Sequence, residues 1–137
     1  MKIHFLILFV FIQFSSFSQN FEEREKITSE FEKSDDIKIE LFNIKLATNK
    51  LDSIQLNSNF LKRKNIKFKI LAFKISGIDK NDKTLFSMKF WNNKIPEEFR
   101  MKLNDCAECK SIKVNEITIN WFTGTYTLNS SQIWNIK

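Results

Sequence analysis

The residue types best suited to chemistry are two cysteines, Cys106 and Cys109, which are separated by two residues. Cysteines at this spacing can be joined across a turn, because their Cα atoms can then lie about 5–6 Å apart. In an oxidising compartment such a pair is expected to form a disulfide. The closed loop is short, so its entropic stabilisation is only about 1–2 kcal/mol. We therefore predict a structural disulfide between Cys106 and Cys109 that fixes the turn between a short helix and the next strand.

Three kinds of reactive site compete with this prediction. Thiol–disulfide exchange stays open as an alternative, although a thioredoxin-type pair begins a long helix, whereas this pair precedes a predicted strand. Covalent haem attachment would need histidine directly after Cys109, and Lys110 stands there. Zinc would need two further thiol or imidazole ligands, which the nearby carboxylates of Asp105 and Glu108 do not replace. We therefore expect no metal and no cofactor.

Histidine is almost missing from the chain, since His4 is the only one. Once a signal peptide is removed, no imidazole remains for acid–base catalysis, for activating a nucleophile or for binding zinc. The acidic neighbours Glu97 and Glu98 do not form a catalytic pair, because adjacent residues on a helix point apart. We expect no catalytic residues and a protein that is not an enzyme.

Two other groups of residues could form binding surfaces. Trp121, Phe122 and Tyr126 could make a platform for a sugar or peptide, although aromatic residues in alternating strands more often belong to the core. The basic cluster 62–64 stands at a predicted strand entrance and could bind an anion. The chain has 22 Lys and Arg against 16 Asp and Glu, a formal net charge of +6. These charges alternate with apolar residues, which indicates the solvated face of a sheet, and we expect no nucleic-acid partner.

The N-terminal residues predict export. Lys2 precedes an apolar run over residues 5–14, and Ser16 and Ser18 are small residues at the positions that signal peptidase reads. This pattern predicts a signal peptide over residues 1–18, cleaved before Gln19, and a periplasmic or secreted protein. A retained anchor is the alternative, but a ten-residue helix spans only about 15 Å of a hydrocarbon core of about 30 Å. We therefore expect no transmembrane segment after cleavage and a single domain over residues 19–137.

Hydrophobic periodicity predicts a mostly β fold. Apolar and polar residues alternate in segments 37–41, 42–46, 66–70, 71–75, 85–91, 112–121, 125–128 and 133–136. The frame slips within 37–46 and 66–75 predict β-bulges or bends. Residues 77–82 predict a turn, Pro96 in the first helical position predicts a short helix over 95–103, and residues 21–33 give a weaker helical pattern. The strand count predicts a small antiparallel β-sandwich with one or two short helices, while a barrel would give the same alternation.

The second half of the chain resembles a known family. The segments that carry the resemblance are Phe68–Ser76, Ile95–Leu103, Ser111–Ile119, the turn at Thr123–Gly124 and Ile133–Ile136. In this order they resemble the C-terminal periplasmic domain of the gliding-motility protein GldM, over about residues 66–137. The resemblance implies an immunoglobulin-like β-sandwich with an interaction role, and it supplies no catalytic residues. One departure is Cys109, which stands near a glycine position of the family.

These observations lead to one main functional prediction. We expect an exported β-sandwich that acts as an interaction or structural module in the cell envelope, with an unknown protein partner that meets its strand edges or loops. The alternatives are thiol–disulfide exchange through Cys106 and Cys109, and a small barrel that binds an apolar ligand.

Overall fold

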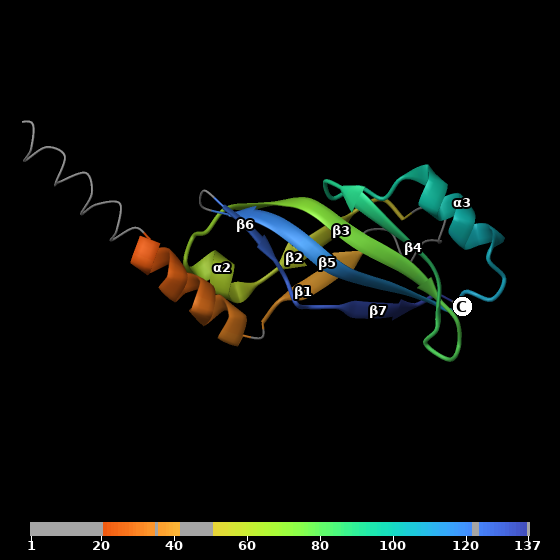
Figure 1. Cartoon of the computed structure of the whole chain (residues 1–137), viewed down its shortest axis with the longest axis horizontal. Helices are drawn as coiled ribbons and strands as arrows, with labels where there is room; N and C mark the ends of the chain where they lie inside the picture. The colour runs from red at the N-terminus through yellow and green to blue at the C-terminus, as the bar shows by residue number, and fades with distance from the viewer. Residues whose placement is uncertain (1–20, 35, 42–50, 122–123, 137) are drawn as a thin grey trace, which may run out of the picture. The chain divides into compact units, whose positions relative to one another are not determined.

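Alternating apolar residues form long antiparallel strands in the second half of the chain. The structure is a computed structural model that describes residues 21–34, 36–41, 51–121 and 124–136 (Figure 1). A first helix covers residues 21–34. The elements that follow are β1 (Lys38–Leu41), β2 (Ile54–Asn57), α2 (Asn59–Arg63), β3 (Phe68–Ile78), β4 (Thr84–Trp91), α3 (Glu97–Asp105), β5 (Ser111–Trp121), β6 (Gly124–Thr127) and β7 (Gln132–Asn135). The chain forms two compact units, Met1–Asp35 and Asp36–Lys137, and all these named strands belong to the second.

The second unit contains two antiparallel sheets. The smaller sheet pairs β1 with β2, and Lys38 lies opposite Asn57. In the larger sheet β3 lies between β4 and β5, and both β6 and β7 pair with the other edge of β5. The predicted mostly β, antiparallel fold with short helices is therefore confirmed. The immunoglobulin-like topology stays a prediction.

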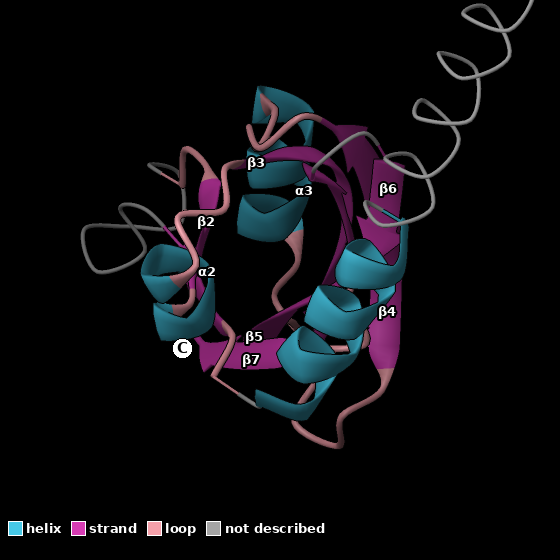
Figure 2. Cartoon of the chain, turned by 90° about the vertical axis from the view of Figure 1, so that its left-hand side faces the viewer, coloured by secondary structure: helices cyan, strands magenta, loops and turns pink. Residues whose placement is uncertain are grey.

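The two sheets are linked at both margins. At one margin the amide nitrogen of Ile54 in β2 donates to the carbonyl oxygen of Asn93, at 2.8 Å, next to an isolated bridge between Ser53 and Lys94. At the other margin the amide nitrogen of Ile39 in β1 donates to Oε1 of Gln132 at 3.2 Å. The strands consequently surround a common interior, with β2 across from β4 and β6 (Figure 2). The two sheets linked in this way form two layers around this interior.

The interior of this unit is filled by aliphatic and aromatic side chains. Its largest fully buried residues are Leu51, Ile54, Phe73, Ile75, Ile78, Phe99, Leu103, Ile112, Val114, Ile117 and Ile119. Phe99 places α3 against the inner face of β4, because its ring centroid lies 5.6 Å from that of Phe86 and 6.3 Å from that of Phe90. Leu103 is buried one turn further along the same helix face. The spacing of these two residues thus explains why the helix packs in this place.

The predicted frame slip within residues 66–75 is confirmed by a register shift in β3, and a second shift places an extra residue on β5. β3 is one strand of 11 residues, and its pairing with β5 shifts between Ile70 and Ala72 and again between Ala72 and Lys74. Glu116, on β5 beside the second shift, has a φ of 50°. Each extra residue bends the strand and increases its twist, which suits a sheet that curves around a core. The other predicted slip falls on residues 42–50, outside the described residues.

Several boundaries differ from the sequence predictions. β2 and α2 were not predicted, so the cluster 62–64 lies at the end of α2 and not at a strand entrance. Gly77 and Ile78 belong to β3, and the turn lies at 79–83, where Oδ1 of Asp79 accepts from the amide nitrogens of residues 81 and 83. Pro96 is the N-cap of α3 and not its first helical residue. The weak helical pattern at 21–33 is confirmed by the helix over 21–34.

The export prediction concerns residues that the structure does not describe. Both the signal peptide over 1–18 and its cleavage before Gln19 fall there, so they stay predictions. No helix among the described residues is long and apolar enough to cross a membrane.

Candidate functional site

The two predicted site cysteines lie in the turn between α3 and β5, which is the place predicted for them. Cys106 is the C-cap of α3, and its amide nitrogen donates to the carbonyl oxygen of Leu103 at 3.4 Å. The amide nitrogen of Cys109 donates to the carbonyl oxygen of Cys106 at 3.3 Å, and that of Lys110 to the carbonyl oxygen of Ile78 at 2.8 Å. The turn thus leads directly into the pairing of β5 with β3. The disulfide itself stays a prediction.

The two cysteines differ in their surroundings. Cys106 is half-buried, whereas Cys109 is fully buried. The sulfur of Cys109 faces Gly77 of β3, since a Cβ built on that glycine would lie 2.7 Å from it. A surface hollow of about 340 Å³ lies beside the turn, and Ala107 and Glu108 are among its lining residues. Of the two thiol positions, only Cys106 is therefore open to a reaction partner from solution.

The other residues that the sequence analysis named do not come together. Trp121 is 5% exposed, and its ring centroid lies 5.5 Å from that of the half-buried Tyr126, so Trp121 belongs to the interior and not to an open platform. Phe122 lies outside the described residues. Glu97 and Glu98 are exposed in the first turn of α3. Within the described ranges, no group of three or more His, Cys, Asp or Glu side chains could hold a metal ion.

An exposed tryptophan, which the sequence suggested for the core-rich half of the chain and not for a site, marks a different surface. Trp91 is the last residue of β4, and 73% of its surface is exposed. The alternation of apolar residues already indicated this position, because Phe86, Met88 and Phe90 share the inner face of β4. Trp91 therefore lies on the outer, polar face with Lys89, whose Nζ is 5.5 Å from the centroid of the indole ring.

The chain turns sharply after Trp91. Asn92 has a φ of 81°, the left-handed region in which asparagine is among the most frequent non-glycine residues. Its amide nitrogen donates to the carbonyl oxygen of Leu71 at 2.7 Å, and its Oδ1 accepts from the amide nitrogen of Lys94 at 2.7 Å. These bonds end the pairing of β4 with β3 and direct the chain towards β2.

Arg100 fixes the segment that follows. Its Nη1 donates to the carbonyl oxygen of Leu51 at 2.7 Å and to that of Ile95 at 3.1 Å. The amide nitrogen of Ile95 in turn donates to the carbonyl oxygen of Asp52 at 2.8 Å. The first turn of α3 is thereby tied to the residues before β2, and the two segments form the walls of one surface cleft.

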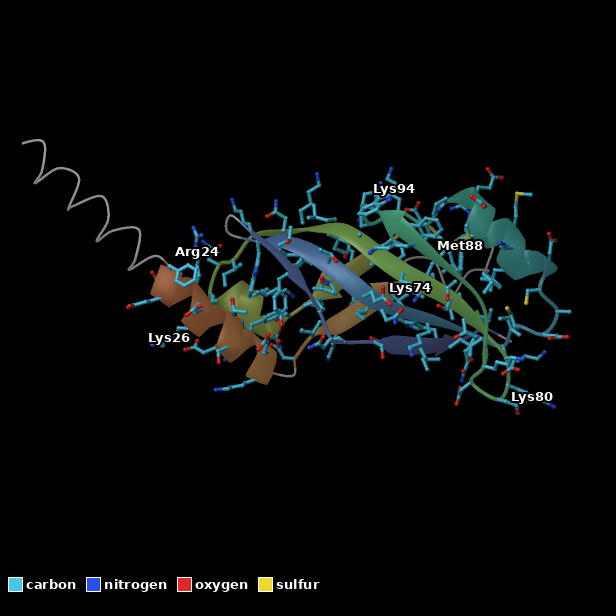
Figure 3. All side chains as sticks on the ribbon, in the orientation of Figure 1. Arg24, Lys26, Lys74, Lys80, Met88 and Lys94 are labelled. Atoms are coloured by element: carbon cyan, nitrogen blue, oxygen red, sulfur yellow. The ribbon has the colours of Figure 1, made fainter. Side chains whose placement is uncertain are left out.

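We call this surface the Trp91 cleft. It has a volume of about 470 Å³, and its lining includes Asp52, Trp91, Asn92, Lys94, Pro96 and Arg100. Two cations and one carboxylate thus line the same cleft as an exposed aromatic ring. Figure 3 labels Lys94 near the end of β4 and Lys80 at the distant tip of the β3–β4 hairpin.

A second hollow lies next to the Trp91 cleft. It has a volume of about 320 Å³ and lies between β2 and the start of β3. We call it the β2–β3 slot; its lining is Ile54, Gln55, Leu56, Phe68, Lys69, Ile70, Asn92 and Asn93. Asn92 lines both hollows, so the slot and the Trp91 cleft adjoin each other at this residue.

Comparison with known proteins gives no matching family model, no matching curated protein and no matching solved structure.

Proposed function

We propose that this chain is an exported, non-catalytic interaction module of the cell envelope that binds a protein partner at the Trp91 cleft. The observation that carries the proposal is the exposure of Trp91, 73% of whose surface is open to solvent at the end of an edge strand. Tryptophan is strongly enriched among the residues that contribute most to protein–protein binding. A large exposed indole beside a cleft is therefore well suited to anchor a partner.

The charges around Trp91 favour an acidic partner segment. Lys94 and Arg100 line the cleft against a single carboxylate, Asp52, and Lys89 lies over the indole ring. A chain with a formal net charge of +6 would also attract an acidic partner from a distance and increase its association rate. The aromatic ring would supply affinity, and the surrounding cations would supply orientation.

The position of the cleft in the fold also supports binding. Trp91 ends an edge strand, and Arg100 holds both walls by its bonds to Leu51 and Ile95. A rigid surface loses little conformational entropy when a partner binds. The resemblance to the GldM domain implies the same kind of role, an interaction in the envelope, and the predicted signal peptide would deliver the chain there.

Thiol–disulfide exchange is the second candidate. It is favoured by the half-buried position of Cys106 and by the surface hollow that the neighbouring Ala107 and Glu108 line. Against it, reactive thiols are favoured at helix N-termini, whereas Cys106 caps the C-terminus of α3. We therefore rank the interaction module first.

Site-specific photo-crosslinking in the native cell envelope tests the proposal. A benzophenone amino acid replaces Trp91 in one variant and Lys80 in a matched control, because Lys80 is exposed at the distant hairpin tip. We expect a discrete crosslinked protein from position 91 and none from position 80, with the chain itself in the envelope or secreted fraction. Identical crosslinking at both positions, or a chain retained in the cytoplasm, would contradict the proposal.

A further inference from the structure

Among the described residues, the first three residues of β3 have a strand partner on one side only. Phe68, Lys69 and Ile70 pair with β5, opposite Trp121, Asn120 and Ile119 respectively. On the other side, β4 pairs with β3 from Ala72 onwards and then leaves at Asn92. Within the described part of the chain, no strand pairs with this edge of residues 68–70.

In the described part of the chain, the facing edge of β2 also lacks a strand partner. Ile54 donates its amide hydrogen to Asn93, so this amide points away from β1. In an antiparallel pair such directions alternate along the strand. The N–H and C=O groups of Leu56, two residues further on, therefore also point away from β1 and towards the slot. Past Ile54, no strand among the described residues pairs with this edge of β2.

The slot between these two edges is one strand wide at its closed end. Asn92 donates its amide hydrogen to Leu71 of β3, and the very next residue, Asn93, accepts from Ile54 of β2. A single chain thus reaches both strands with ordinary hydrogen bonds of 2.7 and 2.8 Å. Neighbouring strands in a sheet lie about 4.8 Å apart, so two edges bridged by one chain are in position to accept one inserted strand.

We propose that an extended segment of the partner protein inserts into the β2–β3 slot as an added strand, with alternating apolar and acidic residues. This inference rests on the proposed function and names the form of the partner. Its apolar residues would meet the inner side of the slot, where Ile54 and Ile70 are buried and Leu56 and Phe68 are half-buried. An added strand hydrogen-bonds through its backbone, and alternate side chains give it specificity.

Charge complementarity selects the acidic residues. Of the described residues that line the slot, Lys69 alone is charged, and Lys67, on the same face two residues earlier, is exposed. Opposite charges on neighbouring strands stabilise a pair, whereas like charges destabilise it. The outward residues of the inserted strand are therefore acidic. Because Asn92 lines both hollows, a partner that inserts a segment into the slot also lies beside the Trp91 cleft and can contact Trp91.

A synthetic peptide tests the inference directly. The probe is a nine-residue peptide that alternates Val and Glu, labelled with fluorescein, and its binding to the full-length purified protein is followed by fluorescence anisotropy. Two control peptides accompany it: one with the same composition in blocks, and one N-methylated at every second residue. We expect the alternating peptide to bind and both controls to bind at least about tenfold more weakly, because they lack the pattern or one row of hydrogen bonds.

Variants of the protein locate the site. Lys69→Glu should weaken binding of the alternating peptide about tenfold. Lys80→Glu, a matched charge reversal at the hairpin tip, should leave its binding unchanged. Leu56→Pro removes the N–H that faces the slot and should abolish binding; amide hydrogen exchange in the unmutated protein should show protection at Leu56 on peptide binding. Circular dichroism of each variant shows whether the fold is kept.

The outcomes separate this inference from the proposed function. The proposal that a strand inserts into the β2–β3 slot is overturned if the alternating peptide does not bind, or if it binds equally to Lys69→Glu and Lys80→Glu. If crosslinking from position 91 persists in Lys69→Glu and Leu56→Pro, strand insertion into the slot is also overturned, but the proposed function is not. If sedimentation shows a dimer that Leu56→Pro converts to a monomer, a second copy of this chain occupies the slot. That result would overturn the proposal that the occupant is a segment of a partner protein.

Discussion

The sulfur of Cys109 occupies the space that a side chain on Gly77 would need. A Cβ built on Gly77 would lie 2.7 Å from that sulfur and 2.6 Å from Cε1 of Phe86. The glycine near the end of β3 is thus explained by close approach and not by a turn. It lets the cysteine turn and the ring of Phe86 meet over β3, at the same place where the pairing of β3 with β4 shifts register.

The first prediction concerns this contact. Gly77→Ala should lower the free energy of unfolding by about 1–3 kcal/mol, the usual cost of an overpacked core. Gly124→Ala is the matched control, because nothing lies within 4 Å of a Cβ at that position. Urea unfolding followed by circular dichroism measures both. Equal stability of the two variants would show that the sulfur and the ring can shift without cost.

The second prediction separates two tryptophans by burial. Trp121→Ala should lower the free energy of unfolding by about 3–5 kcal/mol, because the side chain is 5% exposed and packs on Tyr126. Trp91→Ala should change it by less than about 1 kcal/mol, since Trp91 is 73% exposed. Acrylamide should also quench more of the total fluorescence in the protein that retains Trp91. A large loss of stability in Trp91→Ala would mean that this side chain serves the fold and not a partner.

The third prediction concerns the wall of the Trp91 cleft. Arg100→Ala removes the donor to two backbone carbonyl groups and should cost about 1–3 kcal/mol. It should also weaken partner binding, because the segment between Ile95 and α3 loses its tie to Leu51. Met101→Ala is a suitable control, since Met101 is 58% exposed on the same helix. If both variants bind the partner equally, the cleft does not depend on this tie.

The long strands of this fold and the short strands β1, β6 and β7 could be predicted from the sequence, whereas β2 and α2 could not. β3, β4 and β5 run for eight to eleven residues, which is enough for alternation to be recognised. β2 has only four residues, and its pairing with β1 depends on contacts far along the chain. α2 is capped by Ser58, which accepts from the amide nitrogen of Leu61 and donates to Oδ1 of Asp36, 22 residues earlier. No local pattern contains such a contact.

The candidate site shows the same division. The place of Cys106 and Cys109 between a helix and a strand followed from local patterns around them. The slot did not, because it depends on the departure of β4 at Asn92, whose φ of 81° the sequence leaves open. The exposure of Trp91 could have been predicted, since the alternation along β4 places its side chain on the other face of the strand from Phe90. Surfaces that depend on where a strand leaves its sheet require the three-dimensional structure.

The last prediction tests the disulfide between Cys106 and Cys109. A structural bond in this turn should have a reduction potential below about −300 mV, and its reduction should lower the free energy of unfolding by about 1–2 kcal/mol. Cys106→Ser should lower the free energy of unfolding by the same amount, and reductant should then not change the stability of the variant. Cys106 is the better position for the substitution because Cys109 is fully buried. Equilibration with glutathione and thioredoxin buffers measures the potential. A value of about −120 to −200 mV, with turnover of a model disulfide that Cys106→Ser abolishes, would instead make the chain a thiol oxidoreductase.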